Sequence, residues 1–139
     1  MAARKPASGK RYYTPAQANA TLPLVRRIVA DITEVAGRLR ERQRALARSG
    51  GQLDEVHREE LETEFEQGRQ RLAECERELA QLGIELKDYF SGLIDFPCWM
   101  DGREVYLCWR QGEAEVGHWH ELDAGFAGRR KLLLEAGPR

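Results

Sequence analysis

Two stretches of this chain carry apolar residues at alternating spacings of three and four, and a glycine-rich segment lies between them. The first stretch covers residues 22–46 and the second covers residues 61–82. This spacing places the apolar side chains along one seam of a helix. The serine and two glycines at positions 49–51 form a tight turn, and so short a connection forces two helices to lie antiparallel. The sequence therefore predicts a long, coiled-coil-like helical hairpin over residues 14–83.

The predicted ends of the hairpin have recognisable capping residues. Thr14 is a good N-cap because its hydroxyl accepts from the first free N–H groups, and Pro15 suits the first helical position. Gly83 is a typical residue at a helix end. Pro23 lies just inside the first helix, so either it kinks the first turns or the helix begins nearer to Thr21.

The charged residues are divided between the two helices. The 139-residue chain is long enough for one domain. Its net charge of −1 comes from 22 Lys and Arg against 23 Asp and Glu, and this balance argues against binding nucleic acid or membranes by bulk charge. Residues 15–48 carry seven arginines against three acids, whereas residues 53–82 carry ten acids against four arginines. Opposite charges on the two segments favour packing side by side.

The length of the helices points to a partner. Each has about 30 residues, which is roughly 45 Å at 1.5 Å per residue. Two such helices cannot bury all their apolar surface against each other, so we expect a homodimer in which two hairpins form a four-helix bundle. Nucleic acid is disfavoured as a partner, because no aromatic residues interleave with the arginines of residues 26–48. No apolar run approaches the about 18 residues of a membrane span.

The residue types change after position 83, where all three tryptophans and three of the four phenylalanines lie. Asp101-Gly102 is the strongest hairpin signal in the chain. A two-residue turn there pairs residues 94–100 with residues 103–109 in antiparallel register. One face of this pair is apolar and is expected to be buried. It consists of Ile94, Phe96, Cys98, Met100, Val105, Leu107 and Trp109.

Two further strands complete a predicted antiparallel meander. Residues 84–88 favour a short strand, and residues 115–120 favour a last strand after a second turn. The sheet and C-terminal loop, residues 84–130, are expected to form one domain with the hairpin, whose end or a second subunit covers the apolar face. Residues 1–13 are predicted to be a basic tail, and residues 131–139 a second tail that frays. The predicted fold class is α+β.

A set of motifs at the start of the chain and in its last third is recognisable. They are Tyr13-Thr14-Pro15-Ala16-Gln17-Ala18-Asn19, Leu93-Ile94-Asp95-Phe96-Pro97, Asp101-Gly102-Arg103-Glu104-Val105-Tyr106-Leu107-Cys108-Trp109, Trp119-His120 and Leu122-Asp123-Ala124-Gly125-Phe126-Ala127-Gly128-Arg129. With these motifs the chain resembles, over nearly its whole length, an uncharacterised bacterial family catalogued as domain of unknown function 2203. The resemblance implies a soluble prokaryotic protein of helices followed by a β region, and it implies no activity.

One segment has the residue types of a metal site. His118-Trp119-His120 places two imidazoles on one face of a strand, because side chains alternate with a period of two. Glu121 and Asp123 follow closely, and zinc or iron takes three or four N, O or S donors. The candidate ligands for a divalent metal are His118, His120, Glu121 and Asp123. The alternative is that both histidines are hydrogen-bonded core or interface residues without a ligand.

The register of the last two strands decides whether Asp95 or Cys108 lies near these histidines. A two-residue turn at Gly112-Glu113 pairs charge with charge and apolar with apolar, and we favour that register. It places both histidines on the apolar face, away from Asp95 and Cys108, and leaves further ligands to Glu85 or a helix carboxylate. A bulged, odd-length turn would instead bring both histidines, Asp95 and Cys108 to one face.

A second candidate site is an anion-binding turn between Gly125 and Arg130, with backbone N–H groups and Arg129 as donors. The alternative is a surface turn in which Phe126 is anchored to the core. The chain has no nucleophile elbow, phosphate loop or dinucleotide-binding motif. The sequence therefore predicts no catalytic residue and favours a non-enzymatic protein.

Two functions of different class fit these observations. We favour a dimeric interaction or assembly module driven by the hairpin. The alternative is a metal- or small-ligand-binding protein, with zinc or iron on the His118-Trp119-His120 strand. Three cysteines without a CxxC motif argue against a disulfide framework and favour a reducing cytoplasm, and we expect all three to be buried.

Overall fold

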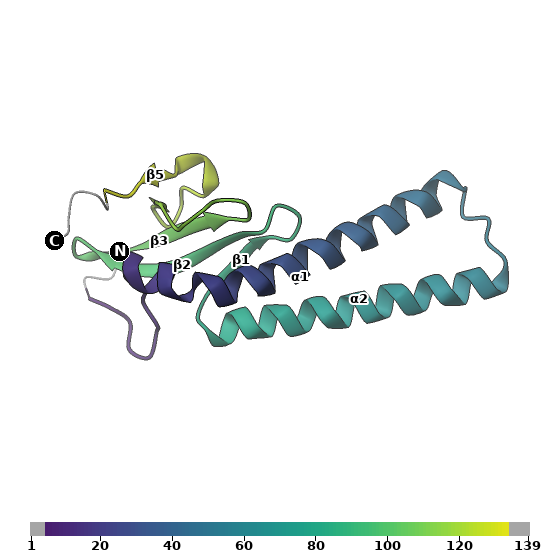
Figure 1. The fold of residues 1–139 in the computed structure, drawn as a ribbon, viewed down its shortest axis with the longest axis horizontal. Helices are drawn as coiled ribbons and strands as arrows, with labels where there is room; N and C mark the ends of the chain where they lie inside the picture. The colour runs from purple at the N-terminus through teal and green to yellow at the C-terminus, as the bar shows by residue number, and fades with distance from the viewer. Residues whose placement is uncertain (1–4, 134–139) are drawn as a thin grey trace.

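A computed structural model describes residues 5–133 of the chain. Helices α1 (Pro15–Arg48) and α2 (Glu55–Gln81) lie antiparallel and are followed by a five-stranded antiparallel sheet in the order β1-β2-β3-β4-β5 (Figure 1). The predicted α+β fold, a long helical hairpin followed by an antiparallel meander, is confirmed. The strands are β1 (Glu85–Asp88), β2 (Leu93–Met100), β3 (Arg103–Arg110), β4 (His118–His120) and β5 (Arg130–Lys131), and a short 3-10 helix, η1 (Phe126–Gly128), precedes β5.

The capping residues define the helix ends as predicted. The Thr14 hydroxyl accepts from the Gln17 backbone N–H at 3.1 Å, and the Gln17 side chain accepts from the Thr14 N–H at 2.9 Å, which is a reciprocal capping box. Pro23 lies inside α1 without ending it, so the alternative start near Thr21 is wrong. Helix α2 ends at Gln81, and Gly83 follows with a φ of +76°.

The hydrophobic core lies between the hairpin and one face of the sheet. The half of the hairpin nearest the sheet supplies buried side chains from both helices, and β2 and β3 supply the apolar face that the sequence predicts. Of that face only Met100 is partly exposed. The sheet and the hairpin therefore share one core. The buried residues of the predicted face are Ile94, Phe96, Cys98, Val105, Leu107 and Trp109.

The register of β2 against β3 is the predicted one. Met100 lies opposite Arg103, and Ile94 lies opposite Trp109. Asp101 and Gly102 both have positive φ, 52° and 78°, as a two-residue type I′ turn requires.

The favoured register of β4 against β3 is wrong, and the odd-length alternative is observed. Cys108 lies opposite His118, and Tyr106 lies opposite His120. The chain turns after Arg110 but does not rejoin the ladder until His118, so the last central strand is shorter than the predicted 115–120. The reason is that Val116 forms its backbone hydrogen bonds with the Asn19 side chain of α1 instead of with β3.

Each predicted tail lies inside the fold at the end where it joins the domain. The Tyr13 side chain is buried, its N–H donates to the Pro97 carbonyl and its hydroxyl donates to the Leu82 carbonyl at 2.6 Å. At the other end, β5 pairs with β4, and Leu132 is buried. The predicted fraying after residue 131 is therefore wrong for residues 131–132, and the rest of that tail from 134 lies outside the described residues.

The β1–β2 turn passes so close to α1 that only glycine fits at position 92. Gly92 has a φ of +68°, and a Cβ there would lie 2.7 Å from Val29 Cγ1 and 3.0 Å from Thr33 Cγ2. We expect Gly92→Ala to cost about 2–5 kcal/mol of unfolding free energy, the sum of backbone strain and overpacking. Gly102→Ala has the same positive φ but open space around it, and should cost about 1–2 kcal/mol. Urea denaturation measures both, and equal losses would contradict the close approach.

Candidate functional site

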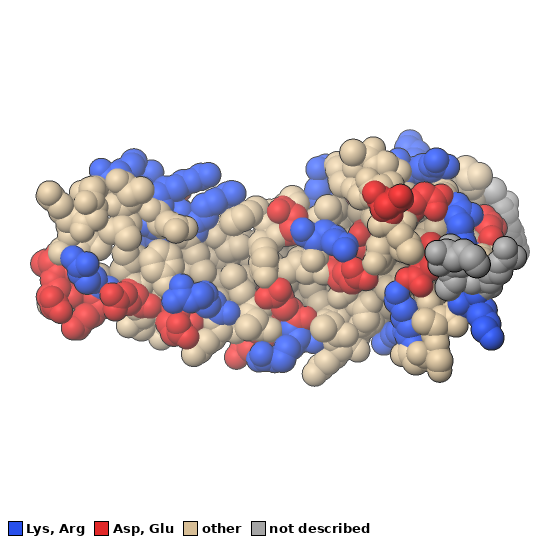
Figure 2. All heavy atoms as spheres, turned by 180° about the vertical axis from the view of Figure 1, so that it is seen from behind, with Lys and Arg blue, Asp and Glu red and all other residues tan. Residues whose placement is uncertain are grey.

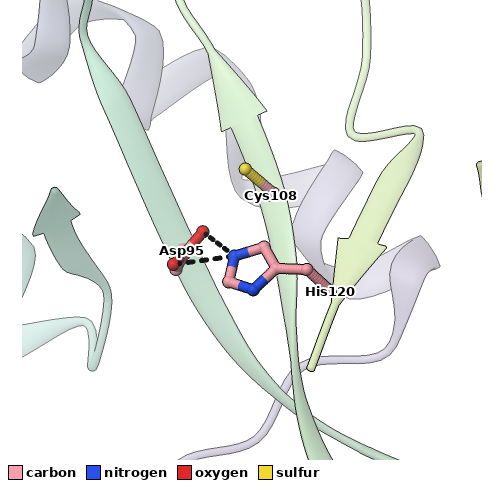
Figure 3. A group of neighbouring side chains, drawn as sticks. All are labelled: Asp95, Cys108 and His120. Carbon is pink, nitrogen blue, oxygen red and sulfur yellow. Dashed lines mark hydrogen bonds and ion pairs between the residues drawn. The ribbon is translucent and has the colours of Figure 1, made fainter. Parts of the chain in front are cut away.

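Three side chains from the three central strands meet on the face of the sheet that is turned away from the helices. They are Asp95 of β2, Cys108 of β3 and His120 of β4 (Figure 3). Asp95 lies directly opposite Cys108 in the ladder, whereas His120 is one diagonal step away and its ring reaches across β3 to Asp95. Asp95 is 2% exposed, His120 3% and Cys108 0%. The small cysteine side chain leaves room for the carboxylate and the imidazole to meet.

The hydrogen bonds of His120 fix its tautomer. Its Nδ1 lies 2.7 Å from the backbone carbonyl oxygen of Glu121, and a carbonyl oxygen only accepts. Nδ1 therefore carries a proton and donates it. The other ring nitrogen, Nε2, lies 3.0 Å from both carboxylate oxygens of Asp95.

This geometry requires a proton or a cation between the two side chains. Without one, the lone pair of Nε2 would face an anionic carboxylate in a dry environment, and both groups would only accept. A proton shared by Nε2 and the carboxylate meets this requirement. A metal ion bound to Nε2 and to the carboxylate meets it equally well.

Cys108 adds a third donor to the pair. One ligand atom from each of the three residues lies within 4.8 Å of the others, and no other group of three or more such residues occurs among residues 5–133. Burial and the neighbouring carboxylate raise the pKa of the Cys108 thiol to about 12. Burial also raises the pKa of Asp95, although the hydrogen bond with His120 opposes it. The cluster is therefore a protonated thiol beside a hydrogen-bonded carboxylate–imidazole pair.

A second polar group flanks the cluster on the β1 side. The Tyr106 hydroxyl donates to Glu85 at 2.7 Å, and Lys87 pairs with the same carboxylate at 2.8 Å. Burial and Glu85 raise the pKa of Tyr106, and its ring packs on His120 with centroids 5.5 Å apart. Glu85, which the sequence offered as a further ligand, is thus engaged by Tyr106 and Lys87.

The structure brings only one of the four predicted metal ligands into the cluster. Glu121 forms a two-bonded ion pair with Arg103, at 3.1 and 2.7 Å. Asp123 is exposed in the turn that follows β4. His118 shares a face with His120, but its Nδ1 lies 3.1 Å from Arg129.

Arg129, the predicted anion donor, is already occupied by an acidic side chain. Its two terminal nitrogens pair with Glu113 at 3.1 and 2.5 Å. The Phe126 ring is not anchored in the core, because 39% of this residue is exposed and its ring lies under the guanidinium groups of Arg110 and Arg129. An anion in this turn would have to displace Glu113.

The sequence places Asp95 and Cys108 beside the histidines only if the turn before the last strand has an odd length. The pairing of Arg110 with Glu115 favoured the other register, but Glu113 accepts from the Arg110 backbone N–H instead. Glycines at 112 and 117 bracket the loop, and this spacing was the signal that the strand does not resume directly after the turn.

Breaking the buried pair should cost far more stability than breaking the exposed one nearby. In metal-free protein, Asp95→Ala leaves Nε2 of His120 buried without a partner, and we expect a loss of about 2–5 kcal/mol in unfolding free energy. The matched control is Glu121→Ala, which removes an ion pair at the surface and should cost much less because water screens it. Urea denaturation of both variants measures the difference. Similar losses would mean that the Asp95–His120 pair is not desolvated.

Comparison with known proteins gives one match. No curated protein matches the chain, and no solved structure does. Residues 11–132 match the family described as an uncharacterized conserved protein, DUF2203. That range includes both helices, all five strands and the whole Asp95–Cys108–His120 cluster. The chain therefore belongs to the DUF2203 family.

Proposed function

We propose that this protein binds a divalent transition metal, zinc foremost, through Asp95, Cys108 and His120. The observation that carries the proposal is the convergence of one oxygen, one sulfur and one nitrogen donor within 4.8 Å. Zinc binds these three donor types at about 2.0–2.3 Å, so its ligand atoms lie within about 4.6 Å of one another. Small side-chain shifts would therefore be enough to close the three donors around one ion.

The surroundings of His120 also suit a metal ligand. Histidines that bind metals donate their other ring N–H to a carbonyl or carboxylate, which holds the ring in place. The bond from Nδ1 to the Glu121 carbonyl is of this kind, and it directs Nε2 towards Asp95. A metal would replace the proton that otherwise lies between Nε2 and the carboxylate.

A reducing compartment fits this proposal, and we propose the cytoplasm. Cys75, Cys98 and Cys108 are all buried and free. Cys108 must remain a free thiol to become a thiolate ligand. No helix among the described residues has a stretch long and apolar enough to cross a membrane.

We propose homodimeric assembly through the hairpin as a second function, on a separate observation. Residues 37–67, all of which the structure describes, include no buried side chain. The two helices project there beyond the sheet (Figure 1). Most of the stability of a helix in a protein comes from packing of its apolar face, and this part of the hairpin packs on no further layer of the described chain. The half-buried apolar residues of this projection are Leu39, Leu46, Leu53, Leu61 and Phe65.

The charges of the projection support a second copy as the partner. Residues 37–48 carry five arginines against one glutamate, and residues 55–67 carry six glutamates against one arginine. Figure 2 shows basic side chains along one edge of the projecting end, mostly acidic ones with some basic ones among them along the other, and uncharged ones between. Within this part of the described chain, only Arg42 and Glu64 form an ion pair between the helices. Two copies therefore offer each other unpaired charges of opposite sign.

The metal proposal predicts about one equivalent of zinc in protein purified without a histidine tag. Asp95→Ala, Cys108→Ala and His120→Ala should each reduce the bound metal several-fold, as measured by elemental analysis after dialysis. Because the thiol must lose its proton and its pKa is raised to about 12, occupancy should fall as the pH is lowered.

The chain contains a matched control for that experiment. His57 and Asp54 form the same kind of contact at 2.8 Å, but on the exposed start of α2. His57→Ala should leave the bound metal unchanged. Metal well below one equivalent in the native protein, or equal loss in His57→Ala and His120→Ala, would refute the proposed site.

The assembly proposal predicts a dimer by light scattering at micromolar concentration. Phe65→Glu places a charge in the apolar strip of the projection and should give a monomer with unchanged helix content by circular dichroism. Val56→Glu is the control, because Val56 is already 62% exposed and should leave the dimer intact. A monomeric native protein would contradict assembly through the hairpin.

A further inference from the structure

We infer that the Glu113–Arg129 pair holds His118 out of the metal site and leaves the fourth coordination position to a small exogenous anion. The inference rests on the metal binding proposed above. It concerns the type of site, because a zinc site with four protein ligands is closed and structural, whereas one with three ligands accepts a further small molecule.

The position of His118 makes it the nearest candidate for a fourth ligand. It lies directly opposite Cys108 in the β3–β4 ladder and two residues from His120, so it projects from the same face of the sheet. Its side chain is half-buried and is not among the three converging residues. The direction of the imidazole, and not its place in the sheet, keeps it from the cluster.

Arg129 sets that direction. Its Nη2 lies 3.1 Å from His118 Nδ1, and a guanidinium only donates, so Nδ1 accepts and its lone pair is used. The proton of the neutral ring is then on Nε2, which cannot bind a metal in that tautomer. The ring is therefore neutral in this contact, with Arg129 on the nitrogen that would bind.

Arg129 is itself held firmly. Glu113 takes two hydrogen bonds from it, and the Glu113 carboxylate also accepts from the Arg110 backbone N–H at 2.8 Å. The Arg129 side chain is only 10% exposed. Glu113 and Arg129 thus form a clamp that links the β3–β4 loop to the start of β5.

The clamp also places a positive charge beside the metal donors. Arg129 Nη1 lies 3.8 Å from the Cys108 sulfur. A guanidinium at that distance favours negative charge on the sulfur and on any ligand bound next to it. The expected ligand is therefore a small monodentate anion, such as hydroxide, a carboxylate or a thiolate.

Cobalt-substituted protein with thiocyanate as the probe tests this inference, because the visible spectrum of Co²⁺ reports its ligands. We expect native protein to bind one Co²⁺ and to show a saturable spectral change on titration with thiocyanate. Arg129→Met frees His118 to turn onto the metal, so the thiocyanate response should be lost. The double variant Arg129→Met with His118→Ala should regain the response.

Two further variants complete the design. Glu113→Gln weakens the hold on Arg129 by another route and should also lose the response, which covers the case in which Arg129→Met does not fold. Arg130→Met is the control, because the neighbouring Arg130 is exposed and lies over Trp119, and it should respond like native protein.

The outcomes separate the two claims. Native protein that binds Co²⁺ but ignores thiocyanate would overturn the open position and leave the metal proposal standing. An unchanged thiocyanate response in both Arg129→Met and Glu113→Gln would overturn the role of the clamp. Native protein that binds no Co²⁺ would overturn the metal site and this inference together.

Discussion

The register of β4 depends on one side chain of α1. The Asn19 side chain accepts from the Val116 N–H at 2.7 Å and donates to the Val116 carbonyl at 3.2 Å, and Val116 is fully buried. This anchor draws the chain out of the ladder before β4 begins. A shift of one residue in a strand moves every side chain to the other face. Without the anchor His120 would face the helices, and the cluster with Asp95 would not exist.

This dependence explains which parts of the molecule could be predicted from the sequence. The hairpin and the Asp101-Gly102 turn follow from local patterns, namely apolar spacing, capping residues and a turn dipeptide, and all of these were predicted correctly. The register of β4 follows from a contact between residues 97 positions apart, which no local pattern contains. The favoured pairing of Arg110 with Glu115 was locally reasonable, but the buried Val116 and its two hydrogen bonds outweigh one exposed ion pair. For the same reason Asp95 and Cys108 were placed beside the histidines only under the register that was not favoured.

Burial of the Asp95–Cys108–His120 cluster costs folding free energy, because its polar side chains lose their hydration in a core that is otherwise apolar. A buried ion pair contributes less to stability than well-packed apolar residues of similar volume, because desolvation offsets the attraction between the charges. The contact between His57 and Asp54 shows the same chemistry without that cost, since both side chains lie in water. Burial of Asp95, Cys108 and His120 is therefore hard to explain as a device for stability. This reasoning supports a ligand for the cluster independently of the distances.

The two proposed functions occupy opposite parts of the fold and have separate physical requirements. The cluster lies on the face of the sheet turned away from the helices, and it depends on strand register and on Arg129. The projecting end of the hairpin lies beyond the sheet, and its residues contribute nothing to the shared core. Both helices link them, because α1 carries Asn19 and both α1 and α2 supply side chains to the core beside the sheet. Binding at one end can therefore influence the other through movement of the hairpin against the sheet.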